Sequence, residues 1–286
     1  MPSNPGIANE LWAFLKLWPY SVRYALYGEW KHETYEKFPL LAIASQGCRK
    51  DIQYIMNRLS KDNIKTYGRH IGKIVHSNPT IAFSYVLNAI ECYDNMIPFV
   101  VEATRYMTEL EFDILCFCLI EALARDSKVR IERNGTTFEK WLKSLSTFCG
   151  TLFARYKIQL DGILTYLSNQ LISDQVYDLV VFQELIASMS GIVPTEDVTS
   201  AQIDGMTGGD TLRREILVSD PHAARKSSSR LIKGLSRTNL IMHFGILVAQ
   251  HRKEIVFRIG EGEEDPTKIP DLKVLAWLND LVSQFS

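Results

Sequence analysis

Apolar residues recur at steps of three and four along almost the entire chain, whereas alternation by two is rare. The first spacing is typical of amphipathic helices, each of which buries one apolar stripe. The longest stripe comprises Phe138, Trp141, Leu142, Leu145, Phe148, Cys149, Leu152, Phe153 and Tyr156. Further stripes begin at Leu160, Val176 and Val274. The pattern predicts an all-α protein.

The predicted helices succeed one another with short connections. They cover residues 9–18, 20–33, 39–58, 61–76, 79–93, 95–106, 108–125, 136–156, 159–172, 174–190, 199–206, 226–250 (with a break allowed) and 270–285. Three helix starts fit a capping box, in which a hydroxyl and a side-chain carbonyl oxygen three residues later bind unpaired backbone N–H groups. These are Thr108 with Glu111, Thr136 with Glu139 and Thr199 with Gln202.

Short connections place neighbouring helices antiparallel, so we expect stacked hairpins in an α-solenoid of the HEAT or armadillo kind. Residues 112–124 are apolar nearly all round, and we expect that helix to be enclosed on several sides. The sequence has no strict repeat, so any repeats are structural only. A compact irregular helical domain is the alternative.

We expect one helical-repeat scaffold domain over residues 1–260. Within it, residues 205–229 contain a Gly-Gly pair, a proline and three consecutive serines, which predict a loop. Residues 261–286 form an acidic connection and then the start of further helices. An apolar helix at the end of a chain normally packs against a neighbouring helix later in the same protein, so we expect a fragment of a longer protein.

Composition narrows the class of protein. The chain is 46% hydrophobic and 23% charged, as globular proteins are, and its net charge of −1 argues against a strongly basic nucleic-acid coat. The longest apolar run is interrupted by Asp113 and Glu121 and is too short to span a bilayer. Residues 1–9 lack the pattern of a signal peptide. We therefore expect a cytosolic or nuclear protein with no membrane partner.

Sequence motifs of catalysis do not occur. There is no P-loop, dinucleotide fingerprint or His-Glu-x-x-His motif, and the six histidines are scattered. Five cysteines among apolar neighbours indicate free thiols in a reducing compartment. Cys116 and Cys118 lie two apart on a predicted helix and point in different directions, which favours core packing over metal ligation. The sequence predicts no catalytic residue, no cofactor and no metal site.

Two basic clusters stand out from the balanced charge. Residues 49–73 carry seven cations against two aspartates, and residues 213–237 carry seven against one glutamate and one aspartate, so each is net +5. The candidate partner-binding residues are Arg213, Arg214, Arg225, Lys226, Arg230 and Lys233. The candidate RNA or partner patch is Arg49, Lys50, Lys61, Lys65 and Arg69. Each cluster fits either a solvated helix face or an electrostatic patch for an acidic protein or RNA phosphates.

The two clusters differ in how many aromatic residues they contain. Single strands of nucleic acid bind where bases can stack on aromatic side chains between basic ones. Tyr54 and Tyr67 lie within the first cluster, whereas no aromatic residue lies between Arg213 and Arg237. The second cluster therefore favours contact with a protein.

Six short blocks occur in an order that resembles one family. They are Arg23-Tyr24-Ala25-Leu26-Tyr27-Gly28 with Trp30, Arg58-Leu59-Ser60-Lys61 with Asn63, Gly72-Lys73 with His76-Ser77-Asn78-Pro79, Tyr93-Asp94-Asn95, Phe148-Cys149-Gly150, and Met206-Thr207-Gly208-Gly209. Together they resemble the middle region of the THO complex subunit 2 family. The resemblance runs from about Leu17 to about Phe257.

The resemblance implies an all-α repeat domain similar to the middle domain of the translation-initiation scaffold that binds a DEAD-box helicase. It also implies a nuclear, non-enzymatic protein, since the THO complex couples transcription to mRNA packaging and export. THO forms the larger TREX assembly with a DEAD-box ATPase, and the family's middle domain is expected to help that ATPase arrange its two lobes productively.

We therefore expect a scaffold segment whose partners are other THO subunits and the DEAD-box RNA ATPase. The loop over residues 205–229 and its basic flank are expected to form part of the docking edge. The alternative is a helical-repeat module that binds RNA directly through its basic faces.

Overall fold

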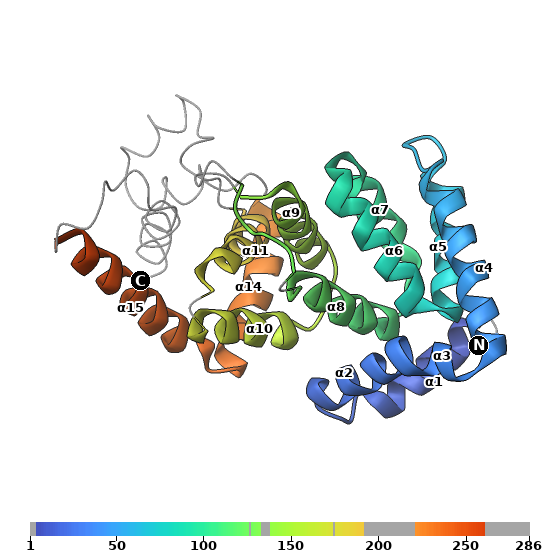
Figure 1. Cartoon of the computed structure of the whole chain (residues 1–286), viewed down its shortest axis with the longest axis horizontal. Helices are drawn as coiled ribbons and strands as arrows, with labels where there is room; N and C mark the ends of the chain where they lie inside the picture. Colours follow the sequence, from blue (N-terminus) through green and yellow to red (C-terminus); the bar gives the residue numbers. More distant parts are fainter. Residues whose placement is uncertain (1–3, 126, 133–137, 174, 192–220, 261–286) are drawn as a thin grey trace. The chain divides into compact units, whose positions relative to one another are not determined.

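The computed structural model describes residues 4–125, 127–132, 138–173, 175–191 and 221–260 (Figure 1). Within these residues, regular structure is helical apart from one isolated bridge between Ile131 and Phe138. This confirms the all-α prediction. The chain divides into two compact units, Met1–Lys128 and Val129–Ser286.

The first unit consists of helices joined by tight turns. Its α-helices are α1 (Pro5–Leu15), α2 (Tyr20–Glu29), α3 (Tyr35–Lys37), α4 (Pro39–Met56), α5 (Ile64–Ser77), α6 (Pro79–Cys92), α7 (Ile97–Ala103) and α8 (Glu109–Leu123). A π-helical turn, η1 (Trp30–Thr34), joins α2 to α3, and 3-10 turns η2 (Asp94–Met96) and η3 (Thr104–Tyr106) flank α7. Proline occupies the first turn of α1, α4, α6 and α7, where its missing N–H has no helical partner to lose.

Helices of the first unit pack in alternation. α4 packs against α6 and α6 against α8, while α5 packs against α7 (Figure 1). Each of these helices therefore contacts the next helix but one along the chain. The arrangement places α4 and α5 as adjacent arms of one hairpin.

α8 is enclosed, as its apolar run predicts. It contacts α1, α2 and α6, and Ile114, Leu119 and Leu123 have no exposed surface. Burying each such side chain contributes about 1.5–3 kcal/mol. Cys116 and Cys118 are buried on the same helix, which confirms their place in the core.

A buried ion pair joins α2 to α8. Arg23 donates from Nε and Nη2 to Asp113 at 2.8 and 3.0 Å, and the Tyr27 hydroxyl donates to the same carboxylate at 2.9 Å. Burial, reinforced by the Asp113 charge, raises the pKa of Tyr27, so the phenol stays a donor. Asp113 can interrupt the apolar run because its charge is fully compensated there.

The α-helices described in the second unit are 12 to 21 residues long. They are α9 (Lys140–Arg155), α10 (Asp161–Ile172), α11 (Leu179–Ser190), α14 (Pro221–Arg237) and α15 (Leu240–Gly260), and the 3-10 turn η4 (Val176–Asp178) precedes α11. α11 contacts both α9 and α14, and α10 contacts α15. Phe182 of α11 stacks on Phe244 of α15 with ring centroids 4.7 Å apart.

Several predicted boundaries are corrected by the structure. The helix predicted over 20–33 ends as α2 at Glu29 and continues through the π-helical turn into α3. The helix predicted over 136–156 begins at Lys140. The break allowed in the helix predicted over 226–250 does occur: it lies where Asn239 adopts φ 55°, a left-handed conformation that asparagine tolerates, and it separates α14 from α15. At Thr108, the backbone N–H donates to Glu111 Oε2 at 2.7 Å, as a capping box requires.

The loop prediction for residues 205–229 is wrong from residue 221 onward, where α14 begins. The reason is that small residues form its packed face. Ser227 is buried and donates to the Met189 carbonyl, and Gly234 is buried against Leu160. Serines and glycines favour loops in general but also permit close helix contact.

Some predicted features fall outside the described residues. They are Thr136, the helices over 199–206 and 270–285, the loop up to residue 220 and the segment 261–286. In the part of the chain that the structure describes, no helix is long and apolar enough to cross a membrane.

Candidate functional site

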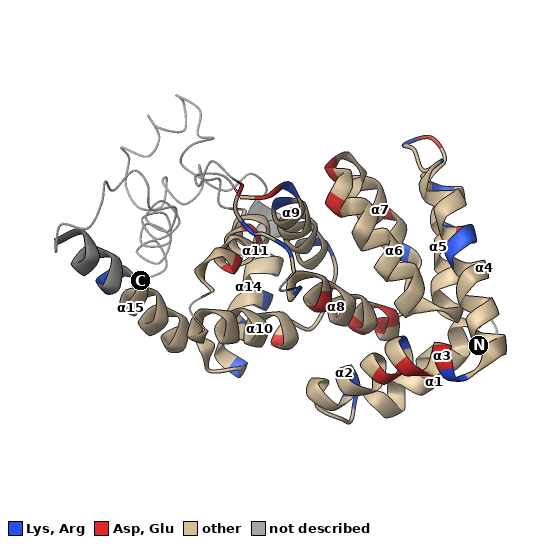
Figure 2. Cartoon of the chain, viewed as in Figure 1, with Lys and Arg blue, Asp and Glu red and all other residues tan. Residues whose placement is uncertain are grey.

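The first basic cluster lies on the hairpin of α4 and α5. All seven cations are exposed, and we call them the α4–α5 basic surface: Arg49, Lys50, Arg58, Lys61, Lys65, Arg69 and Lys73. The five residues predicted as an RNA or partner patch are all among them. Figure 2 shows basic segments along α5 and in the turn that joins it to α4.

These cations differ from the other basic residues of the first unit. Of the seven other lysines and arginines up to Lys128, six form an ion pair with aspartate or glutamate, and Lys16 is the exception. No cation of the α4–α5 basic surface has such a pair within the described chain, although Asp51 and Asp62 lie in the same stretch. The surface therefore carries positive charge that the described carboxylates do not neutralise by direct pairing.

Close packing determines which face of α5 carries this charge. Gly68 is buried, and a Cβ placed there would lie 3.1 Å from the Tyr106 ring. The helix can approach η3 so closely only on that face. The exposed face has a basic residue at every fourth position, at Lys65, Arg69 and Lys73. These three residues form one stripe, with a rise of about 6 Å from each to the next.

The turn between α4 and α5 is held by Asn63. Its side-chain nitrogen donates to the Arg58 carbonyl at 2.7 Å, and its side-chain oxygen accepts from the Ser60 N–H at 2.8 Å. Arg58 then lies over the ring of Tyr54, with its guanidinium carbon 3.7 Å from the ring centroid. Tyr54 is 54% exposed, so the stacked pair is open to solvent. The sequence places the two residues four apart but does not reveal the stacking.

The second basic cluster is less uniform. Lys226 and Lys233 are exposed on α14, two turns apart. Arg237 is exposed but pairs with Asp161 at 2.6 Å. Arg225 belongs to α14, although its side chain is not described, and the predicted Arg213 and Arg214 lie outside the described residues.

Arg230 has an internal partner. Its Nη2 donates to the Ala154 carbonyl at 2.8 Å, and its Nη1 donates to the Tyr156 carbonyl. Both acceptors lie at the C-terminal end of α9, where helical carbonyls lack partners within the helix. Burial lowers the pKa of Arg230. Of the predicted partner-binding residues, Arg230 thus joins two helices.

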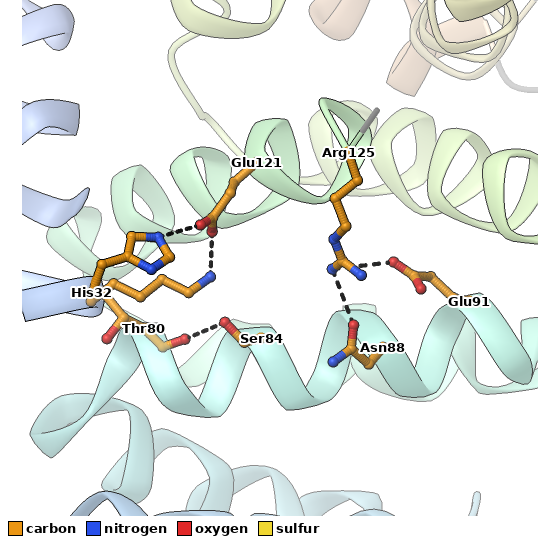
Figure 3. A network of polar contacts seen from close by, with 8 residues as sticks. His32, Thr80, Ser84, Asn88, Glu91, Glu121 and Arg125 are labelled. Atoms are coloured by element: carbon orange, nitrogen blue, oxygen red, sulfur yellow. Dashed lines mark hydrogen bonds and ion pairs between the residues drawn. The ribbon is translucent and has the colours of Figure 1, made fainter. Parts of the chain in front are cut away.

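Two glutamates of the first unit each contact two basic side chains, and Figure 3 shows Glu121 with His32 and Glu91 with Arg125. Glu121 of α8 accepts from Lys31 and lies 2.6 Å from His32 Nε2, so it fastens the π-helical turn to α8. Glu91 of α6 pairs with Arg125 at 3.5 Å and with Lys128. Sequence reasoning missed these pairs, since their partners lie 34 or more positions apart.

Other buried carboxylates are also paired. Glu111 of α8 binds His76 of α5. In the second unit, Asp178 accepts from Arg130 at 2.9 Å and from the Tyr166 hydroxyl at 2.7 Å. Buried charges with partners of this kind hold elements together.

The thiols are unsuited to nucleophilic chemistry where they are buried. Burial raises the pKa of Cys118 to about 12 and that of Cys48 to about 11, so both stay protonated at neutral pH. Cys92 is exposed. Among the described residues, no group of three or more His, Cys, Asp or Glu side chains is placed to hold a metal ion.

Two protein families match adjacent parts of the sequence. Residues 1–69 match the family described as the N-terminus of THO complex subunit 2, and residues 71–146 match the family described as a transcription- and export-related complex subunit. The two matches together extend over the first unit and into α9.

Curated relatives named THO complex subunit 2 match over longer stretches. The human relative is 41% identical over 286 residues, which is all of this chain and 18% of that protein. The Arabidopsis thaliana relative is 38% identical over 264 residues, or 90% of this chain and 14% of that protein. A relative from Saccharomyces cerevisiae is 24% identical over 215 residues, or 75% of this chain and 13% of that protein. The chain spans less than a fifth of the length of these relatives, and it belongs to the THO complex subunit 2 family.

Proposed function

We propose that this chain is a scaffold segment of the nuclear THO complex and acts within TREX in transcription-coupled mRNA packaging and export. It docks a DEAD-box RNA ATPase and other THO subunits and has no catalytic activity of its own. The observation that carries the proposal is the match to THO complex subunit 2 relatives over the whole chain. The buried charges pair with one another and hold helices together, which supports a function carried by the outer surface.

The proposed architecture is an α-solenoid of helical hairpins. In the first unit, α4, α6 and α8 pack in succession while α5 packs on α7, and in the second unit α9, α11 and α14 are in contact while α10 contacts α15. Contact between every second helix is typical of stacked hairpins. Such a stack has long outer faces for holding partners.

The ATPase-docking edge is proposed to include α14. Lys226 and Lys233 are exposed on this helix, and the lack of aromatic residues between 213 and 237 favours a protein surface over single-stranded RNA. A rigid edge that binds one arrangement of the two ATPase lobes more tightly than another shifts the equilibrium toward it.

The test is a double charge reversal, Lys226→Glu with Lys233→Glu, in the 286-residue chain. Binding of the DEAD-box ATPase is measured by titration, and stimulation of its RNA-dependent ATP hydrolysis is measured in parallel. We expect binding to weaken about tenfold or more, because like charges then face each other across the contact. Arg230 stays unchanged, since its contacts with α9 are structural.

The matched control reverses two other exposed lysines, Lys16→Glu with Lys157→Glu. This variant is expected to bind and stimulate like the parent chain. Equal loss in both variants, or no binding by the parent chain at micromolar concentration, rules out α14 as the docking edge.

A further inference from the structure

The α4–α5 basic surface has a property that scaffold packing does not require. All seven of its cations are exposed and lack ion pairs within the described chain, while nearly every other cation of the first unit has one. Exposed cations without carboxylate partners attract polyanions from solution, and the attraction grows with the number of charges that can act together.

The arrangement of these cations suits an extended chain of charges. Lys65, Arg69 and Lys73 lie in line along α5, with a rise of about 6 Å between neighbours, and Arg58 and Lys61 continue the charge into the turn. Asn63 holds that turn through two hydrogen bonds. The row is therefore fixed by helix and turn before any ligand arrives.

An aromatic platform lies at one end of the row. The Arg58 guanidinium is stacked on the ring of Tyr54, which is 54% exposed. His70 is also exposed and lies edge-on to Tyr67, with ring centroids 6.3 Å apart. Single strands bind planar groups beside a row of cations, since unpaired bases stack while phosphates bind the cations. The Asp and Glu side chains of an acidic peptide carry no ring that could stack in this way.

We propose that the α4–α5 basic surface binds single-stranded nucleic acid. Lys65, Arg69 and Lys73 bind successive phosphates, and the Tyr54–Arg58 pair stacks against a base. This site is separate from the ATPase-docking edge proposed on α14. It adds direct contact with the strand to the scaffold role.

The experiment titrates the 286-residue chain into labelled single strands of about 15 nucleotides at several salt concentrations, using polyuridine RNA and thymidine DNA. Two further probes are a duplex of the same length and a peptide rich in Asp and Glu. A triple variant, Lys65→Gln, Arg69→Gln and Lys73→Gln, is expected to bind the single strands at least tenfold more weakly. Its slope of log affinity against log salt is expected to shrink by about 2, because each lost phosphate contact to a single strand removes about 0.7.

Two further variants separate charge from stacking. The control Lys16→Gln, Lys37→Gln and Arg105→Gln removes three exposed cations elsewhere in the first unit and is expected to keep affinity within twofold. Tyr54→Ala is expected to weaken binding up to about tenfold without changing the salt slope, since it removes a stacking surface and no charge. Thermal unfolding confirms that each variant remains folded.

Four outcomes overturn the proposal: no binding of either single strand at low salt, equal loss in the control variant, tighter binding of the duplex, or tighter binding of the acidic peptide. The comparison of RNA with DNA shows which strand the site prefers. ATPase docking is measured on the same triple variant and is expected to be unchanged. A failure of one proposal is therefore distinguishable from a failure of the other.

Discussion

Gly150 lies in the middle of α9, where a glycine weakens a helix by about 1 kcal/mol relative to alanine. A Cβ at this position would lie 2.5 Å from the Glu184 carbonyl oxygen and 2.7 Å from Ser188 Oγ, both on α11. The missing side chain therefore lets α9 and α11 pack at close range. From the sequence, the same glycine fits either a helix end or a helix interior.

Gly150→Ala is expected to destabilise the chain by about 1–3 kcal/mol, because the added methyl group forces the two helix backbones apart. The control is Gly47→Ala in α4, where a Cβ meets nothing within 4 Å. That change is expected to stabilise by up to about 1 kcal/mol. Urea unfolding monitored by circular dichroism measures both, and a neutral or stabilising Gly150→Ala contradicts the close approach of α9 and α11.

At the scale of elements, α14 shows what periodicity predicts and what it omits. The stripe pattern locates most helices, and the enclosed α8 is a direct consequence of its apolar run. Only the start of α14 is missed: residues 221–225 fall in the stretch predicted as a loop, because Pro221 and the nearby serines favour loops when no partner helix is considered, whereas the helix predicted from residue 226 covers the rest. Likewise, the sequence of residues 30–34 does not by itself predict a π-helical turn, because the turn is held by Glu121 of a distant helix.

The basic clusters of the candidate site are likewise predicted only in part by the sequence. Charge counting finds the α4–α5 cluster, because helix geometry alone keeps those residues on the surface. It cannot show that Arg230 of the second cluster turns inward, since the Ala154 and Tyr156 carbonyls that receive it lie more than 70 positions away. A cation's availability depends on tertiary partners.

Arg230→Ala is expected to destabilise the second unit by about 1–3 kcal/mol, because two carbonyls at the end of α9 lose a charged donor. Lys233→Ala on the same helix is exposed and is expected to change stability by no more than about 0.5 kcal/mol. Denaturant unfolding of both variants gives the comparison. Equal effects would mean that the Arg230 contacts contribute nothing to the packing of α14 on α9.

Over the whole molecule, both units contain buried thiols or phenols whose pKa is raised by burial. Burial raises the pKa of Cys118 and Cys48 in the first unit and of Cys149 and Tyr166 in the second. For Tyr166 the Asp178 charge adds to the effect. In each case the folded chain holds its proton at a pH where the unfolded chain has begun to lose it.

These raised pKa values determine how the stability of the folded chain changes at alkaline pH. The thiols titrate near pH 9.0 when unfolded, while the folded pKa is about 11 for Cys48 and about 12 for Cys118. Above about pH 9 the unfolded state binds fewer protons than the folded state, so stability is fully present below about pH 9 and is lost as pH rises toward about 12. We expect urea midpoints to fall progressively at about pH 9, 10 and 11 relative to about pH 7.

Thiol labelling tests the same point independently. At about pH 8 only Cys92, the exposed thiol, should react quickly, and the four buried thiols should react only as the chain unfolds. Cys118→Ala with Cys149→Ala should flatten the fall in stability with pH, because two of the groups that cause it are gone. Cys92→Ser should leave the fall unchanged, since that thiol is exposed in the folded state. Rapid labelling of several thiols under these conditions is incompatible with the packing described, because a thiol enclosed in α8 or α9 reacts only after its helix separates from its neighbours.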